Sequence, residues 1–296
     1  MIKALTLATF LSLAAVSLHT IADDQISCQT RIESNLLNSW ERQLYDYYPE
    51  MFVSIVRCDQ NFYDFFIGAM HEGLHALDTD LKAAQEMMLQ IESGNLEYDP
   101  SFIENNIKIH TQSGYVLSLP RFNNDLPTPK DLLNPYFLNP SIQKSEQFES
   151  FFYEYVEDDE AMSSGSFSAG FFLEWSAYLH GLKSSLLRKE QLIRPIGQGE
   201  GLIFFIIITE IYLNQLEINH QEEFLSIKRS DEALELLRVL DSESKEVLQS
   251  FDYCSEYSAD HSVLKTLNDI TKTDTLKRLT EAEFTSNELL RDYLEN

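Results

Sequence analysis

The chain has 296 residues, 44% of them hydrophobic, and includes 19 Phe and 14 Tyr, so it can bury a substantial core and is not expected to be disordered. Its 48 acidic and 22 basic side chains give a formal net charge of −26. Such a charge repels phosphate backbones and anionic lipid headgroups, which argues against nucleic acid and membrane surfaces as partners. A solvation trait of a salty or cold habitat would explain the charge equally well, so the charge identifies no partner.

The first residues are typical of an export signal. Lys3 precedes the uncharged apolar run Ala4–Val16, and Thr20-Ile21-Ala22 offers a small-residue cleavage site. The run is too short to span a bilayer stably; a true transmembrane anchor is the alternative interpretation. We therefore expect a signal peptide at 1–22 and a single domain at 23–296 without a membrane anchor. Its location would be the periplasm or the extracellular space.

Three cysteines remain after removal of such a signal: Cys28, Cys58 and Cys254. In an oxidising compartment two of them can pair and leave the third free. We expect a Cys28–Cys58 pair, because it would connect the new N-terminus to the segment before residue 61. No CxxC or Cys–His spacing is present, so neither a thiolate metal site nor a thiol nucleophile is indicated.

Hydrophobic spacing predicts a mainly α-helical fold of the α+β class with a small β-hairpin. The Pro-rich stretch 120–140 is expected to form a long ordered loop or a boundary, and residues 260–296 a polar helical tail with little apolar surface. The expected helices are Ile32–Tyr48, Asn61–Ile91, Ser145–Glu157, Ser168–Lys189, Gly201–Asn219 and Ser230–Ser250, and the hairpin strands are Asn106–His110 and Tyr115–Leu119.

Inside the second helix, His71-Glu72-Gly73-Leu74-His75 carries the strongest chemical pattern of the chain. Two histidines four residues apart leave the same face of a helix, so each can give one nitrogen to a single tetrahedral Zn²⁺. Glu72 projects beside such an ion, where it can take a proton from a zinc-bound water and pass it to a leaving amine. The alternative is a pair of surface histidines on an acidic helix.

Asp78 lies on the same helical stripe, three residues after His75. It is placed either to accept a hydrogen bond from a metal-binding histidine or to remain a solvated helix carboxylate. The sequence leaves both interpretations open.

The HEGLH segment resembles the HExxH metallopeptidases, the zincins, over five residues strictly and over roughly thirty loosely. In the metzincin branch a third histidine follows six residues after the second, and Leu81 occupies that position here. The gluzincin branch, which includes thermolysin-like enzymes and the anthrax lethal factor type, takes a Glu from a later helix that often reads Glu-x-x-Ala followed by an aromatic residue.

Residues 171–178, Phe-Phe-Leu-Glu-Trp-Ser-Ala-Tyr, are similar to that gluzincin helix, with Glu174, Ala177 and Tyr178 on one face. The resemblance implies that Glu174 is the third ligand of one Zn²⁺ held by His71 and His75. The long separation from His75 would then hold an insertion that forms walls of a substrate cleft.

Other polar residues compete for roles at this site. Glu210 interrupts the apolar run Leu202–Ile208, where a carboxylate needs a partner or a metal, so it is an alternative third ligand or a partner of a ligand histidine. Asp158, Asp159 and Glu160 form a charge run that is typical of a solvated face, and His180 and His110 are interpreted as ordinary polar residues. The candidate oxyanion stabilisers are Tyr178, Tyr153, Tyr212 and Tyr257.

The sequence thus predicts a secreted zinc metallohydrolase, with a peptidase that acts on peptide or protein substrates as the leading hypothesis. Glu72 would be the catalytic residue. The main alternative is a secreted helical binding protein whose HEGLH is fortuitous or binds metal without turnover. A hydrolase of non-peptide bonds is the third possibility.

Overall fold

The computed structural model describes residues 23–56, 58, 62–94, 107–119, 126–137, 146–157, 167–188, 196–250 and 273–295. The expected signal peptide, the acidic run Asp158–Glu160, Cys254 and Tyr257 lie outside these ranges. The described residues are mainly helical and contain one two-stranded antiparallel sheet, which confirms the predicted fold class.

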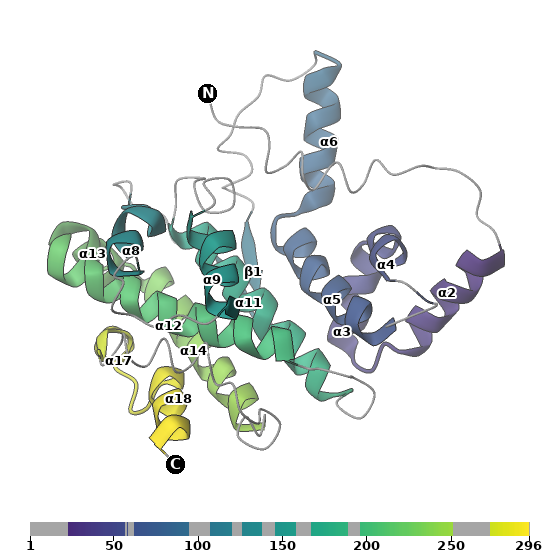
Figure 1. Cartoon of the computed structure of the whole chain (residues 1–296). Helices are drawn as coiled ribbons and strands as arrows, with labels where there is room; N and C mark the ends of the chain where they lie inside the picture. The colour runs from purple at the N-terminus through teal and green to yellow at the C-terminus, as the bar shows by residue number, and fades with distance from the viewer. Residues whose placement is uncertain are drawn as a thin grey trace.

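The described residues of the N-terminal third form five helices, drawn in purple and blue in Figure 1: α2 (Asp23–Ser34), α3 (Ser39–Tyr47), α4 (Pro49–Ile55), α5 (Phe62–Asp78) and α6 (Leu81–Glu92). The prediction of one helix over 32–48 is wrong, because α2 ends at Ser34 and Asn38 begins α3 by accepting a hydrogen bond from the Glu41 amide (2.8 Å). The predicted helix over 61–91 is likewise two helices, since Asp80 between them has a left-handed φ of 47°.

Cys28 of α2 and Cys58 form a disulfide, as predicted. The bond joins α2 to the segment that leads into α5. Disulfides persist in oxidising compartments outside the cytoplasm, so the pairing agrees with an exported protein.

A hairpin follows α6, with β1 (Lys108–His110) antiparallel to β2 (Val116–Ser118) and Ile109 opposite Leu117. The predicted hairpin is confirmed over these shorter strands. Its turn is fixed by the carboxylate of Glu243, which accepts hydrogen bonds from the amides of Gln112 (3.0 Å) and Ser113 (2.8 Å).

The Pro-rich stretch contains a helix, α8 (Pro129–Phe137), so the predicted loop through 120–140 is wrong for this part. Pro129 opens the helix, and the Thr128 hydroxyl accepts a hydrogen bond from the Asp131 amide (3.1 Å). Proline suits a first helical position because the amide it lacks would have no partner there. Next come α9 (Glu146–Phe152) and a π-helical turn, η1 (Tyr153–Glu157).

Two long helices, α11 (Phe167–Leu186) and α12 (Ile196–Asn219), pack against each other in the larger hydrophobic core. Within the described part of the chain, the stretch Gln198–Asn219 of α12 is long and apolar enough to cross a membrane, but 78% of its apolar window is buried inside the protein. A core helix passes the same test of length and composition, so the stretch is weak evidence for a membrane span.

The chain then forms α13 (Gln221–Lys228), α14 (Asp231–Ser250), α17 (Thr275–Thr280) and α18 (Ser286–Glu295). The predicted tail is helical where it is described, but the expectation of little apolar surface is wrong. Leu276, Leu279, Leu289 and Leu290 are all buried in the larger core.

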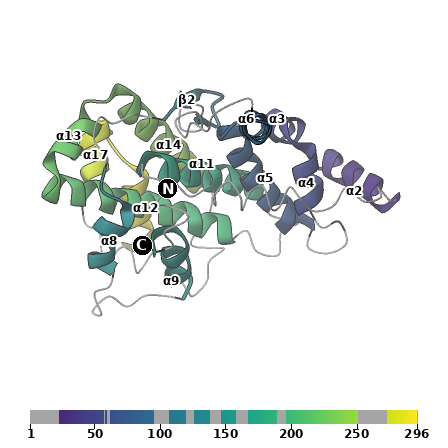
Figure 2. The same ribbon diagram turned by 90° about the horizontal axis from the view of Figure 1, so that it is seen from above.

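Most buried apolar side chains of the described residues belong to two clusters. The smaller cluster consists of residues from α2 to α5 together with Ala177 of α11, and the larger one of residues from the hairpin onward. Figures 1 and 2 show the same division from two directions, with α2–α6 on one side, the later helices on the other and α11 reaching between them. A buried bidentate ion pair also bridges the clusters, from Arg188 to Glu41 (2.6 and 2.7 Å).

Candidate metal centre

His71 and His75 lie on the face of α5 that meets α11, and both side chains are buried. Their Nε2 atoms are 3.1 Å apart. One helical turn separates the two residues, so the helix itself brings the two imidazoles together, as the spacing predicted.

Glu174 of α11 completes the group from the opposite helix. Its Oε1 lies 3.3 Å from His75 Nε2, and its Oε2 lies 3.5 Å from His71 Nε2. Ala177, one turn further along α11, has no exposed surface, and its small side chain is part of the smaller cluster. The three residues form a group that could hold a metal ion.

The three distances fit a metal centre. Zinc bonds of 2.0–2.2 Å in tetrahedral geometry place neighbouring donor atoms roughly 3.3–3.5 Å apart. The observed separations of 3.1, 3.3 and 3.5 Å between the three donor groups are close to these values. Two imidazole nitrogens directed at each other and at a carboxylate need a cation or a proton between them, because unprotonated ring nitrogens are acceptors.

The electrostatics of the group also favour a bound cation. Burial disfavours the charged form of His75, but the nearby negative charge and hydrogen bond of Glu174 outweigh it and raise the pKa of His75 to about 9. Burial opposes ionisation of Glu174 too, yet the two histidines hold the pKa of its carboxyl far below its ordinary range. The site therefore stabilises positive charge next to a permanent carboxylate.

Glu72 follows the first histidine and is partly exposed. Its negative charge acts on His75, so it lies beside the group rather than in it. Among the described residues none forms a hydrogen bond or ion pair with its carboxylate. This position would allow the Glu72 carboxylate to accept a proton from a water molecule next to the two histidines.

An aromatic wall borders the two histidines. The edge of the Tyr178 ring packs against His71, with ring centroids 4.7 Å apart, and the Tyr178 and Tyr155 hydroxyls are 2.8 Å apart. Of the predicted oxyanion stabilisers, Tyr178 is thus beside the centre, whereas Tyr153 is exposed and the Tyr212 hydroxyl donates to the Pro127 carbonyl (2.6 Å). Tyr155 had no signal in the sequence, because its π-helical segment has no distinctive pattern.

Asp78 differs from both interpretations offered by the sequence. It is fully buried and accepts hydrogen bonds at Oδ1 from His110 Nδ1 (2.7 Å) and from the His110 amide (3.0 Å). Burial raises the pKa of Asp78 to about 6, although the hydrogen bonds from His110 oppose the shift. The pair joins β1 to α5 one turn beyond His75.

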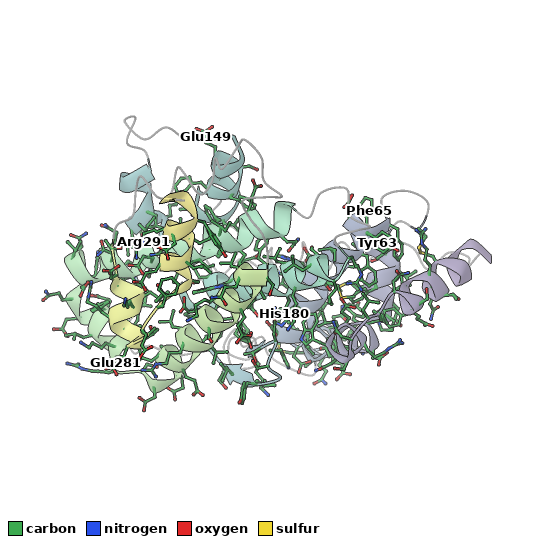
Figure 3. The ribbon with its side chains drawn as sticks, turned by 90° about the horizontal axis from the view of Figure 1, so that it is seen from below. Tyr63, Phe65, Glu149, His180, Glu281 and Arg291 are labelled. Atoms are coloured by element: carbon green, nitrogen blue, oxygen red, sulfur yellow. A yellow bond between two sulfur atoms is a disulfide. The ribbon has the colours of Figure 1, made fainter. Side chains whose placement is uncertain are left out.

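Two further candidates are placed away from the centre. Glu210 accepts hydrogen bonds from the Thr273 hydroxyl and from the Thr275 and Leu276 amides (2.7, 2.6 and 2.8 Å), so its oxygens cap α17 and do not reach the histidines. His180 stacks on Trp40 (centroids 4.2 Å apart) and its Nδ1 donates to the Ser176 carbonyl (2.8 Å). Figure 3 shows His180 where the two sets of helices meet.

Burial lowers the pKa of His180 to about 3, so this imidazole is neutral. A neutral imidazole agrees with the interpretation of His180 as a polar residue outside the candidate metal group.

Comparison with protein-family models, with curated proteins and with solved structures finds no match to the chain. The His71–His75 spacing fits the HExxH pattern, and the buried His-His-Glu group could hold a metal ion.

Proposed function

We propose that this chain is an exported zinc metallopeptidase whose ion is held by His71, His75 and Glu174. The observation that carries the proposal is the convergence of three donor groups from two helices at separations typical of tetrahedral zinc. Three protein ligands leave a fourth position open, which is the arrangement of catalytic rather than structural zinc sites.

When bound, zinc lowers the pKa of a coordinated water to near neutrality and polarises a carbonyl oxygen. The chain's own residues supply the proton transfers. Glu72, beside the histidines and partly exposed, takes a proton from the attacking water and delivers it to the leaving amine. Tyr178, packed on His71, is the candidate donor for the oxyanion that forms at the carbonyl.

The first test is metal content. Protein purified without chelator at neutral pH should contain about one zinc per chain, measured by elemental analysis, and His75→Ala should lose it. Zinc-free wild-type protein under these conditions would instead support the secreted binding protein.

The second test separates catalysis from metal binding. Glu72→Gln should keep its zinc but cleave a mixed peptide library at least roughly 100-fold more slowly than wild type, since general-base catalysis contributes 10²–10⁴-fold. Glu86→Gln is the matched control, because Glu86 is an exposed carboxylate on the next helix, and it should cleave normally. Full activity in Glu72→Gln would rule out the mechanism, and zinc without peptide cleavage in wild type would favour a hydrolase of other bonds.

A further inference from the structure

Lys108 and His110 are two basic residues of β1 that the proposed mechanism does not use. Because side chains alternate along a strand, both lie on one face of the hairpin, while Ile109 between them is fully buried in the larger core. Lys108 is exposed, and none of the residues that the structure describes forms an ion pair with it. Its ammonium is therefore available to an anion from outside the chain.

The neighbouring strand completes this face. Val116 lies opposite His110, and Ser118 lies opposite Lys108. Val116 is 53% exposed, and Ser118 is exposed as well. We call these four residues the outer hairpin face. It combines two basic side chains with an exposed apolar one.

A buried carboxylate fixes the orientation of the His110 ring. Asp78 Oδ1 accepts a hydrogen bond from His110 Nδ1 (2.7 Å), so Nδ1 carries a proton in this contact. The His110 side chain is 17% exposed, and its Nε2 keeps contact with solvent and has no hydrogen-bond partner among the described residues. When Nε2 is protonated, it is a hydrogen-bond donor in a fixed position on the outer hairpin face.

The hairpin does not need this imidazole in order to dock. Glu243 already holds the turn, and the Gln112 side chain donates to the Leu179 carbonyl of α11 (3.0 Å). The His110 amide donates to Asp78 independently of its ring (3.0 Å). Asp78 Oδ2 is buried and has no partner in the described part of the chain. Such a half-satisfied carboxylate costs stability, which favours a role in function over a role in folding.

The outer hairpin face lies beside one end of the candidate metal centre. β1 contacts both α5 and α11, and Figure 1 shows it between the two sets of helices. Asp78 follows His75 by one turn on the same stripe of α5, and its negative charge acts on His75. Tyr178 packs on His71 and so borders the other end. An extended peptide advances about 3.3–3.6 Å per residue, so a peptide held at the centre can present a group a few residues further on to the hairpin.

We infer that the outer hairpin face binds the C-terminal carboxylate of the peptide substrate, between the Lys108 ammonium and the protonated His110 imidazole. The inference rests on the proposed function in that the carboxylate belongs to the molecule being cleaved. Charge-assisted hydrogen bonds are about twice as strong as neutral ones, and Val116 offers an apolar contact to the last side chain of the peptide. A net charge of −26 repels anions from most of the surface, so an anionic group binds where basic side chains offset that charge.

The probe for this subsite is N-acetyl-L-leucine, with N-acetyl-L-leucinamide as its uncharged counterpart. The α-amide of N-acetyl-L-aspartic acid, which carries only a side-chain carboxylate, distinguishes the two sources of this group. Binding is measured by NMR titration of the full-length exported protein at pH 6.5, the ordinary pKa of histidine, with ionic strength held constant. Each titration is repeated after EDTA treatment, because a bound metal also accepts carboxylates. The measurement needs neither zinc nor turnover, so a failure of the proposed function leaves this result intact.

Lys108→Gln and His110→Asn are the test variants. The first removes an exposed charge, and the second keeps a donor for Asp78 but removes Nε2. Lys228→Gln is the matched control, because Lys228 is exposed on α13 and its loss changes the net charge by the same amount as Lys108→Gln.

We expect wild type and Lys228→Gln to bind N-acetyl-L-leucine in preference to both amides, before and after EDTA treatment. Lys108→Gln should bind it about threefold more weakly, as for an exposed ion pair, and His110→Asn about tenfold more weakly. Unchanged binding in either test variant, an equal loss in Lys228→Gln, or loss of binding after EDTA treatment would overturn the inference. Equal binding of the aspartic acid α-amide would overturn the assignment to a chain terminus.

Discussion

Glu174 and Glu210 are carboxylates on two packed core helices, but their oxygens have different partners. Glu174 is directed at two imidazole nitrogens, and Glu210 at two backbone amides and a hydroxyl. Only a cation can satisfy the first arrangement fully, whereas hydrogen bonds already satisfy the second. The two residues should therefore respond differently to the same substitution.

Glu174→Ala should lower zinc affinity by more than roughly 100-fold, since it removes a ligand rather than an outer partner. Glu210→Ala should keep its zinc but lose about 1–3 kcal/mol of unfolding free energy, because the amides that begin α17 lose their acceptor. Chelator competition and denaturant unfolding measure the two quantities. Zinc loss in Glu210→Ala together with zinc retention in Glu174→Ala would contradict the ligand assignment.

Glu200 should make stability depend on pH. Its folded pKa of about 7 lies above its ordinary value of 4.5, so the folded state keeps the proton longer as pH rises. Unfolding free energy therefore falls as pH rises between these two values, and the full penalty is present above pH 7. Glu200→Gln should be more stable than wild type by about 1–3 kcal/mol at pH 8, and the difference should disappear near pH 4. Denaturant unfolding of both proteins at each pH measures this difference in unfolding free energy. A difference that stayed the same from pH 4 to pH 8 would contradict the raised pKa of Glu200.

The side chains of the candidate metal site could be predicted from the sequence, whereas their surroundings could not. His71 and His75 are related by one helical turn, and Glu174 shares a helix face with Ala177 and Tyr178. Spacing within single helices was therefore enough to predict these positions. The Asp78–His110 pair joins residues 32 positions apart, and the hairpin's docking sets it. Local patterns contain nothing about which strand residue meets which helix, and the same limit explains why Tyr155 was missed.

Among the helices, α11 and α12 approach each other closely at two glycines. Gly201 has no side chain where the Tyr178 ring packs, and Gly181 has none where Gln198 packs. By contrast, a methyl group added to Gly68 of α5 would have no atom within 4 Å. The two kinds of glycine can be distinguished by substitution.

Gly201→Ala should destabilise the protein by about 1–3 kcal/mol or more, because the added methyl overlaps the Tyr178 ring. Gly68→Ala should stabilise it by about 0.5–1 kcal/mol through helix propensity alone. Thermal unfolding of both variants gives the comparison. Since Ala favours a helix at both positions, a stabilised Gly201→Ala would show that the two helices do not approach as described.

The sequence predicted the type of each element better than the residues at which the element begins and ends. The hydrophobic period runs through residues 79 and 80 without Gly or Pro, and only the left-handed backbone of Asp80 ends α5 there. The start of α8 did carry a signal, since Thr128-Pro129 with Asp131 three residues after Thr128 is typical of a capped helix start. The density of prolines around it concealed the pattern.

At the scale of the whole molecule, the centre lies between two hydrophobic clusters. His71 and His75 belong to a helix of the smaller cluster, and Glu174 to a helix of the larger one. The Glu41–Arg188 ion pair and the Asp78–His110 pair cross the same boundary. A metal ion bound here would add a further link between α5 and α11, beside Ala177 of α11, which already packs in the smaller cluster.

Zinc should therefore stabilise the whole fold and not only its own ligands. A ligand present at 100 times its Kd, and bound only by the folded state, adds about 2.7 kcal/mol to the unfolding free energy. For a chain of this size that corresponds to a rise of roughly 5 °C in Tm. We expect EDTA treatment to lower the Tm by this amount, added zinc to restore it, and Glu174→Ala to melt at one temperature with or without zinc. If zinc left the wild-type Tm unchanged, the three side chains would not be holding an ion between the two cores.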